Sequence, residues 1–345
     1  MVLLVATFVT LDYVEYVDDF LDGGATMADV FGTYYLHYVP DILRLTSPLA
    51  VFLAATYVTA RLAQSMQLTA LHASGVSLAR YARPLVGAAA LIAVGMWAFN
   101  GWVVPPATAV VHAFQNEYYR DAPERTSGSE IYRQAAPGVV LAMRYYDREQ
   151  ARAFGVQLVQ IDTAGGSALG ERIDAADMEW VDSLGVWSLR SAVERTFAPD
   201  GAERFRRDAK RDTALALTPR DLARSGRDAE RLTLPEARAY VKSLERSGVR
   251  DRGRPEVAYL AKHAYPVANL IVVLIAIPLA ARRRRGGQAV QLAIGLGVAF
   301  LYLALQKTVE PLGFVGTIPA AVAVWLPHAA FTVVAAVVWM RAERR

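Results

Sequence analysis

The sequence offers few side chains at spacings that support catalysis. Its five histidines all lie in or beside apolar segments, and they form neither an HExxH pair nor another pair at metal-ligand spacing. The pattern G-x-x-x-x-G-K-[ST] does not occur, so the sequence contains no P-loop for ATP. Cysteine is absent as well, which excludes disulfides, thiolate nucleophiles and cysteine metal sites. We therefore expect no catalytic residue, metal or cofactor, and we expect a partner or an ion gradient to supply energy.

Composition divides the chain into three parts. Hydrophobic residues make up 54% of the 345 residues and concentrate at 1–110 and 258–340, whereas residues 115–257 carry most of the charge. The net charge of +4 is modest, and basic residues stand in short runs beside apolar segments. Nucleic-acid binding favours a basic stripe interleaved with aromatic residues, so nucleic acid is not an expected partner. The composition predicts a membrane protein whose middle part faces water.

Five apolar segments have the length of about 20 residues that a helix needs to cross a bilayer. They are residues 36–60, 85–104, 258–281, 290–308 and 318–340. A sixth segment, residues 1–17, is short and is interrupted by Asp12 and Glu15, so we expect the natural first helix to begin upstream of Met1. It has no basic flank or cleavage site, which argues against a signal peptide.

The sequence thus predicts a membrane α-helical protein with six transmembrane helices in a 3+3 arrangement. Residues 1–104 hold the first three helices, residues 258–345 hold the last three, and residues 105–257 form an inserted domain. Lysine and arginine in short loops favour the cytoplasmic side of a membrane. If every segment crosses, the arginines of three regions share that side: Arg61, Arg80 and Arg83, residues 282–285, and Arg341, Arg344 and Arg345. We expect a bacterial inner-membrane protein with both termini cytoplasmic and the middle domain periplasmic.

The middle domain shows β-type alternation between turn-forming residues. The alternating stretches are residues 139–146, 153–162, 170–180 and 185–197. Ala-Pro-Gly, Ala-Gly-Gly-Ser and Asp-Ser-Leu-Gly separate them, which favours consecutive antiparallel hairpins. The pattern predicts an all-β jelly-roll or sandwich. A helix at 234–247 follows, because Thr233 and Glu236 have capping-box spacing and Gly248 suits a C-terminal cap.

The loop between the second and third predicted spans favours a short amphipathic helix at residues 61–75. Leu62, Met66, Ala70 and Ala73 recur at helical spacing, and Gly75 suits the helix end. Such a helix lies on the membrane surface or docks into a groove on another protein. Surface helices usually carry lysine and arginine on their polar face, and this segment has few charges. Docking on a cytoplasmic partner is therefore the favoured interpretation.

Several motifs resemble the LptF/LptG permease family, and the resemblance spans nearly the whole chain. They are Tyr-Val-Asp-Asp-Phe-Leu-Asp-Gly-Gly, Tyr-Tyr-Leu, Pro-Asp-Ile-Leu, Pro-Leu-Ala, Leu-Thr-Ala-Leu-His-Ala-Ser-Gly-Val-Ser and Arg-Pro-Leu. The resemblance implies a transmembrane subunit of an ABC-type exporter that extracts lipopolysaccharide from the inner membrane. It further implies a second, LptF-like permease as heterodimer partner, a cytoplasmic LptB-like ATPase dimer that binds ATP, and periplasmic LptC/LptA-like bridge proteins.

The same resemblance implies the residues of an ATPase-coupling helix. They are Gln67, Leu68, Ala70, Leu71, His72, Ala73, Ser74 and Gly75. Gln67 stands where the family commonly has Glu and His72 where it commonly has Arg, so a charge-assisted contact becomes a neutral hydrogen bond.

A further departure concerns the lipid. The family's first helix often carries lysine near its periplasmic end, whereas this chain has Glu15, Asp18, Asp19 and Asp22, which repel phosphate. A lipid with fewer phosphates, or binding through the partner permease, reconciles the two. The candidate lipid-contacting cations elsewhere are Arg44, Arg120, Arg125 and Lys307, and interfacial anchoring is the alternative for each. Candidate inward-facing residues of the β-domain are Val140, Ala142, Val156, Leu158 and Trp187, with a plain packed core as the alternative.

Two other function classes stay open on sequence alone. A secondary transporter driven by an ion gradient is one, because Lys262, Lys307 and Glu310 stand near span ends, where membrane charges can relay protons. A membrane-anchored periplasmic lipid-binding or scaffold protein is the other. A bound ATPase distinguishes the exporter from both.

Overall fold

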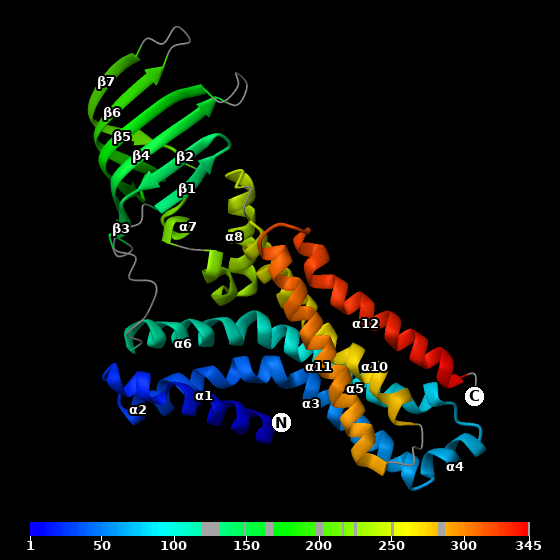
Figure 1. Ribbon diagram of the computed structural model, residues 1–345. Helices are drawn as coiled ribbons and strands as arrows, with labels where there is room; N and C mark the ends of the chain where they lie inside the picture. The colour runs from blue at the N-terminus through cyan, green and yellow to red at the C-terminus, as the bar shows by residue number, and fades with distance from the viewer. Residues whose placement is uncertain are drawn as a thin grey trace. The chain divides into compact units, whose positions relative to one another are not determined.

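A computed structural model shows a chain of two compact units (Figure 1). It describes residues 1–118, 131–147, 150–162, 168–197, 203–215, 217–223, 226–249, 252–281 and 287–343. The first unit, here called the helical unit, comprises Met1–Ala122, Glu230–Pro235 and Gly253–Arg345. The second, the β unit, comprises Pro123–Ala229 and Glu236–Arg252.

The N-terminal part of the helical unit contains two long continuous helical stretches, Met27–Gln64 and Leu78–Tyr118, with one helix before them and a short helix between them. Its N-terminal elements are α1 (Val2–Asp22), α2 (Met27–Asp29), the π-helical segment η1 (Val30–Tyr35), α3 (Leu36–Gln64), α4 (Gln67–Ala73), α5 (Leu78–Ala98), the π-helical segment η2 (Phe99–Val103) and α6 (Val104–Tyr118). Thr26 and Asp29 form a capping box at the start of α2, and the Ser77 hydroxyl accepts a hydrogen bond from the Arg80 amide at the start of α5. α6 therefore continues the third predicted span well beyond residue 104, and the domain boundary expected at residue 105 lies after α6.

Four further helices complete the helical unit. They are α9 (Gly253–Ala264), α10 (Val267–Ala280), α11 (Gly287–Phe314) and α12 (Ala320–Glu343). Close helix packing depends on glycine here, since a Cβ on Gly313 would stand 2.5 Å from the Ala323 Cβ, and one on Gly253 would stand 2.3 Å from the Gly313 carbonyl oxygen. The buried centre of α10 packs against α3, α5 and α12.

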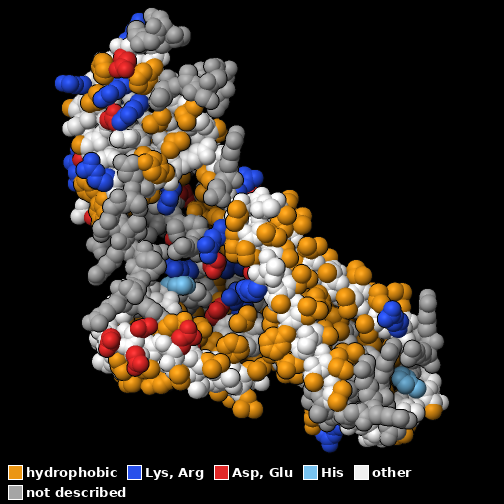
Figure 2. Space-filling view, viewed as in Figure 1, with side chains coloured by type: hydrophobic (Ala, Val, Ile, Leu, Met, Phe, Trp, Pro, Cys, Tyr) orange, Lys and Arg blue, Asp and Glu red, His pale blue; other side chains and the backbone are white. Residues whose placement is uncertain are grey.

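Four described helices are long and apolar enough to cross a membrane: Met27–Gln64, Leu78–Tyr118, Ala293–Phe314 and Ala320–Ala342. The pair α9 and α10, bent by 50° between Ala264 and Val267, makes a fifth candidate if it counts as one broken span. These five correspond to the five expected apolar segments. α1, which corresponds to the interrupted sixth segment, does not meet the same criterion among the described residues. Figure 2 shows hydrophobic side chains over the outer faces of α11 and α12, where Phe300, Leu301 and Val333 are exposed, as lipid contact requires.

The β unit is built on one antiparallel sheet. Its strands are β1 (Ile131–Ala136), β2 (Val139–Met143), β3 (Tyr145–Asp147), β4 (Arg152–Asp162), β5 (Ala168–Val181), β6 (Val186–Phe197) and β7 (Glu203–Thr213). Their order is β1-β2-β4-β5-β6-β7, with β3 pairing β4 (Figure 1). The predicted antiparallel β-domain inserted between helical parts is thus confirmed. The described strands form a single sheet, however, so a second facing sheet is not part of the described fold.

The inner face of the sheet is covered by the chain that follows β7. Leu217 and Leu222 join the strand residues in the core, and the Trp187 indole donates a 2.7 Å hydrogen bond to the Leu217 carbonyl. The remaining elements after β7 are α7 (Pro219–Ala223), the 3-10 helix η3 (Gly226–Arg231) and α8 (Leu234–Arg246). α8 begins after Thr233 as predicted, and Gly248, at φ +70°, ends it with the Val249 amide bonded to the Leu244 carbonyl.

Candidate functional site

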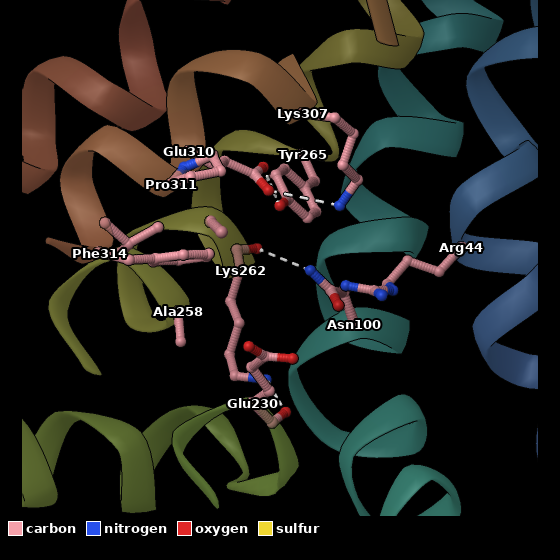
Figure 3. Close-up of a pocket in the computed structure, with 12 residues that line it drawn as sticks. Arg44, Asn100, Glu230, Ala258, Lys262, Tyr265, Lys307, Glu310, Pro311 and Phe314 are labelled. Carbon is pink, nitrogen blue, oxygen red and sulfur yellow. Dashed lines mark hydrogen bonds and ion pairs between the residues drawn. The ribbon is translucent and has the colours of Figure 1, made fainter. Parts of the chain in front are cut away.

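A polar cavity lies inside the helical unit, where α3, η2, α9 and α11 approach one another (Figure 3). Its volume is about 230 Å³. The lining residues are Arg44, Asn100, Glu230, Val257, Ala258, Ala261, Lys262, Tyr265, Lys307, Glu310, Pro311 and Phe314. Three cations and two carboxylates thus meet in a unit that is otherwise largely apolar.

Glu310 is the buried carboxylate of this cavity, with 4% of its surface exposed. It accepts a hydrogen bond from the Tyr265 hydroxyl and lies 3.3 Å from the Lys307 ammonium, one helical turn earlier on α11. Tyr265 stands at the bend between α9 and α10, immediately before Pro266. The carboxylate therefore ties the bend of the broken span to α11.

Arg44 approaches from α3 and has its own acidic partner. Its Nη2 atom lies 2.6 Å from Asp41 Oδ1, one turn earlier, and its guanidinium carbon lies 5.7 Å from the centre of the Tyr265 ring. An aromatic face favours a cation at this distance. Arg44 and Lys307, two of the cations predicted from sequence, thus both lie near the ring of one tyrosine.

Lys262 completes the cationic set from α9. Only 5% of its surface is exposed, and its ammonium donates a 3.2 Å hydrogen bond to the backbone carbonyl of Glu230. The Asn100 amide donates at 3.4 Å to the Lys262 carbonyl. Among the described residues, no carboxylate lies within ion-pair distance of the Lys262 ammonium, so its charge faces a neutral acceptor.

The cavity lining has the chemistry of an anion-binding site. Its cations outnumber its carboxylates, and the described part of the chain holds no group of three or more His, Cys, Asp and Glu side chains that could bind a metal. Sequence reasoning noted Lys262 and Glu310 as charges near span ends, but it did not find Tyr265 or Asn100. The Tyr-Pro dipeptide at 265–266 was the available signal, because proline disrupts the helix interior. Arg120 and Arg125 lie outside the described residues.

The predicted coupling helix is shorter than expected. α3 continues to Gln64, Met66 has a left-handed backbone (φ +60°), and α4 then spans Gln67–Ala73. Gly75, at φ +84°, ends it as predicted, with the Val76 amide bonded to the Leu71 carbonyl. The His72 ring shares a 2.8 Å hydrogen bond with the Val76 carbonyl.

The residues of α4 divide into one buried and several exposed positions. Leu68 is only 2% exposed, and α4 packs against α3. Leu71 is 36% exposed, and the other predicted coupling residues are exposed: Gln67, Ala70, His72, Ala73, Ser74 and Gly75. Leu68 therefore stabilises the chain's own fold, and Leu71 with the small residues around it forms the free apolar face.

The predicted lipid-facing residues of the β unit fall on two faces. Val156, Leu158 and Trp187 belong to the core on the inner face. On β2, Leu141 pairs with Leu158 of β4, and both belong to the inner face. Val140 and Ala142 are the neighbours of Leu141 on either side, and they pair with Val159 and Gln157. Because strand side chains alternate, Val140 and Ala142 point to the opposite face, and their assignment as inward-facing residues was wrong.

An open cavity of about 220 Å³ lies on the inner face beside Leu158. Its lining is Ala135, Ala136, Val139, Leu158, Gln160, Glu171, Ile173, Arg211, Thr213, Ala214 and Leu215. Apolar side chains occupy most of it, and Glu171 and Arg211, whose ion pair measures 3.4 Å, form its polar part. Such a cavity suits an amphipathic ligand.

Several apolar helices long enough to cross a membrane, with an antiparallel β unit between them in the chain, fit a membrane permease with an inserted β domain. The family model for "Lipopolysaccharide export system permease LptF/LptG" matches residues 1–341, so the chain belongs to this family of membrane permeases. The chain is 22% identical over 331 residues to the lipopolysaccharide export system permease protein LptG of Escherichia coli strain K12, covering 95% of this chain and 91% of that protein. The LptG protein of E. coli O6:H1 strain CFT073 matches with the same identity and coverage.

Proposed function

We infer that this chain is the transmembrane permease subunit of an ABC-type exporter that extracts lipopolysaccharide, or a related glycolipid, from the inner membrane. The observation that carries this proposal is the family match over residues 1–341. The relatives from E. coli are named as permeases of lipopolysaccharide export. In this proposal the chain contributes the route for the lipid and a separate protein supplies the energy.

The proposed energy source is a cytoplasmic LptB-like ATPase dimer that docks on α4. Support comes from Leu71, whose apolar side chain is exposed on the short helix α4. The residues near it, Ala70 and Ala73, are small. Burying one leucine side chain is worth about 1.5–3 kcal/mol, so a docking surface centred on Leu71 needs additional contacts from its rim. A second, LptF-like permease completes the transmembrane part.

The proposed lipid route begins at the polar cavity and ends at the β unit. Arg44 and Lys307 line the cavity and meet the anionic groups of the lipid, whereas the exposed Glu15, Asp18 and Asp19 of α1 disfavour phosphate there. The inner-face cavity beside Leu158 then receives the acyl part, and an LptC/LptA-like periplasmic bridge takes it onward. A glycolipid with few phosphates fits this distribution of charge.

Co-purification tests the proposal. The full chain is expressed with its native neighbours, purified in mild detergent through a terminal tag, and analysed by native mass spectrometry. We expect two permease chains and two ATPase chains in one assembly.

A secondary transporter is the second candidate, because Glu310 and Lys262 are buried charges in the helical unit. Proton-driven lipid movement by the purified chain in liposomes without an ATPase would establish that alternative and refute the exporter.

A further inference from the structure

The short segment Glu230–Pro235, here called the strap, is held on the helical unit by contacts at both of its ends. At one end the Lys262 ammonium donates to the Glu230 carbonyl at 3.2 Å, and Arg254 Nη2 lies 3.4 Å from the Glu230 carboxylate. At the other end Leu234 packs on Gly101, where a Cβ would lie 3.5 Å from the Leu234 Cβ. The strap belongs to the helical unit but lies in the chain between two segments of the β unit. Its attachment therefore restrains the chain that enters the β unit.

Lys262 is an unusual residue for this task. A buried ammonium loses its hydration, and a neutral carbonyl compensates for this loss less well than a carboxylate does. The ammonium has three donors, and its bond to Glu230 uses one of them. A neutral donor such as a glutamine amide would bury no charge at this position. The choice of lysine points to a second, anionic partner.

The cavity beside the strap has room for that partner. Arg44 is paired with Asp41. Figure 3 shows Lys307 paired with Glu310, whereas the Lys262 ammonium faces the Glu230 carbonyl. Lys262 and Glu230 both line the cavity of about 230 Å³. An anion that enters meets in Lys262 a cation with no carboxylate in ion-pair distance among the described residues. The bond to the carbonyl is already assisted by the charge of the ammonium, but an anion adds the attraction between opposite charges in a largely desolvated site, so the ammonium moves toward the anion.

We propose that Lys262 is an anion-operated latch for the strap: a phosphate or carboxylate group bound in the cavity draws the ammonium away from the Glu230 carbonyl, and Leu234 then separates from Gly101. Ligand binding shifts the strap only because the anion binds the released state better. The identification of the anion as the headgroup of the lipid rests on the proposed function. In that case, binding of the headgroup in the helical unit releases the chain segment that leads into the β unit. The latch chemistry is the same for free phosphate.

An engineered disulfide measures the latch directly. The chain has no cysteine, so the double substitution Gly101→Cys and Leu234→Cys introduces the single possible pair. The Cβ separation of 3.5 Å is within the range that disulfides adopt. In the purified full-length protein, the rate of oxidative cross-linking reports how much of the time the strap lies on η2. We expect rapid cross-linking without ligand, and a rate about fivefold lower with saturating inorganic phosphate.

Substitutions at the cations assign the effect to Lys262. With Lys262→Met, cross-linking is expected to be slow from the start and insensitive to phosphate, whereas Lys262→Arg keeps both the fast rate and the phosphate effect. Lys242→Met is the matched control, because Lys242 is an exposed lysine of α8 that does not line the cavity, and it is expected to keep both the fast rate and the phosphate effect. Equal rates for the parent pair and Lys262→Met would overturn the latch. The phosphate titration on the parent pair needs no change at Lys262, so misfolding of that variant does not remove the test.

A comparison of two vesicle compositions identifies the source of the anion. The cysteine pair is reconstituted in phosphatidylcholine alone and in phosphatidylcholine with lipopolysaccharide. Slower cross-linking in the second vesicle assigns the anion to the lipid, and slowing by free phosphate alone assigns it to a soluble anion. No slowing in either arm would refute the latch. The assay contains no ATPase and no ATP, so a failure of the exporter proposal leaves its result interpretable.

Discussion

At the scale of single residues, Leu71 carries the proposed link to an energy source. It is 36% exposed, so Leu71→Asp leaves the core of the helical unit intact. The substitution places a carboxylate in the proposed interface, where loss of solvation without a partner costs several kcal/mol. We expect the ATPase to be lost from the purified complex while the amount of protein in the membrane stays normal.

Gln67→Glu is the matched control for this prediction. It adds the same charge to the same helix at the exposed first residue of α4. We expect binding of the ATPase to be unchanged, or stronger if a basic residue lies opposite. An ATPase that co-purifies with Leu71→Asp at the parent stoichiometry would exclude Leu71 from the interface.

Asp177 gives a second residue-scale prediction, for stability and its pH dependence. Burial raises the pKa of its carboxyl, but hydrogen bonds from Arg152 (3.1 Å) and Arg190 (2.7 Å) outweigh burial and hold the pKa below the usual range. Because the pKa is lower in the folded than in the unfolded protein, the ionised carboxylate stabilises the fold at pH values above the unfolded-state pKa. This stabilisation is lost as the pH falls through the folded-state pKa. Asp177→Asn should therefore lower the free energy of opening of β5 and β6 at pH 7 by about 1 kcal/mol.

Hydrogen exchange of the β5 and β6 amides measures this difference. The penalty should shrink at pH values below about 4, where the unfolded carboxyl is protonated. Asp208→Asn serves as control, because its partner Arg206 is largely exposed and the change should stay within about 0.5 kcal/mol. A penalty for Asp177→Asn that does not depend on pH would contradict the assignment to its charge.

At the scale of elements, the alternation of β2 and β4 makes the lipid route testable. Leu158 lines the inner-face cavity, and Val140 lies on the opposite face of the same sheet. A photo-crosslinking residue at Leu158 should capture lipopolysaccharide in cells, and the same residue at Val140 should not. Capture at Val140 alone, or equally at both, would make the β unit a spacer without an internal route.

Element boundaries show which parts of the fold could be predicted from the sequence. β4, β5 and β6 alternate apolar and polar residues and were located to within a few residues. β7 was missed because its sequence, ERFRRDAKRDT, is charged on both faces, and its pairing with β6 rather than apolar alternation makes it a strand. α6 was assigned to the middle domain because its composition is less apolar than that of α5, although the helix continues.

The candidate site was predictable only in part, for a related reason. Arg44 and Lys307 could be proposed as cations in apolar surroundings, but their meeting around Tyr265 depends on how α3, α9 and α11 pack. Likewise, periodicity could not tell that Leu68 is buried against the chain itself and Leu71 is free, since both fit one apolar face. Tertiary packing decides between them.

At the scale of the whole molecule, orientation in the membrane is the next prediction. The predicted topology places both termini in the cytoplasm and residues 105–257 in the periplasm, because arginines cluster in the loops assigned to the inside. A reporter fused at Gly201 should be active as a periplasmic enzyme and one fused after Arg345 as a cytoplasmic protein. The reverse pattern would place α4 on the periplasmic side, away from a cytoplasmic ATPase, and would exclude the proposed coupling.

Energy-dependent lipid transfer tests the central claim most directly. The permease is reconstituted with its co-purifying chains into vesicles that contain lipopolysaccharide, and release to a soluble periplasmic acceptor is measured with and without ATP. The exporter proposal predicts release that requires ATP hydrolysis, is absent when this chain is omitted, and is abolished by Leu71→Asp. Release that proceeds without ATP and follows an imposed proton gradient would contradict it.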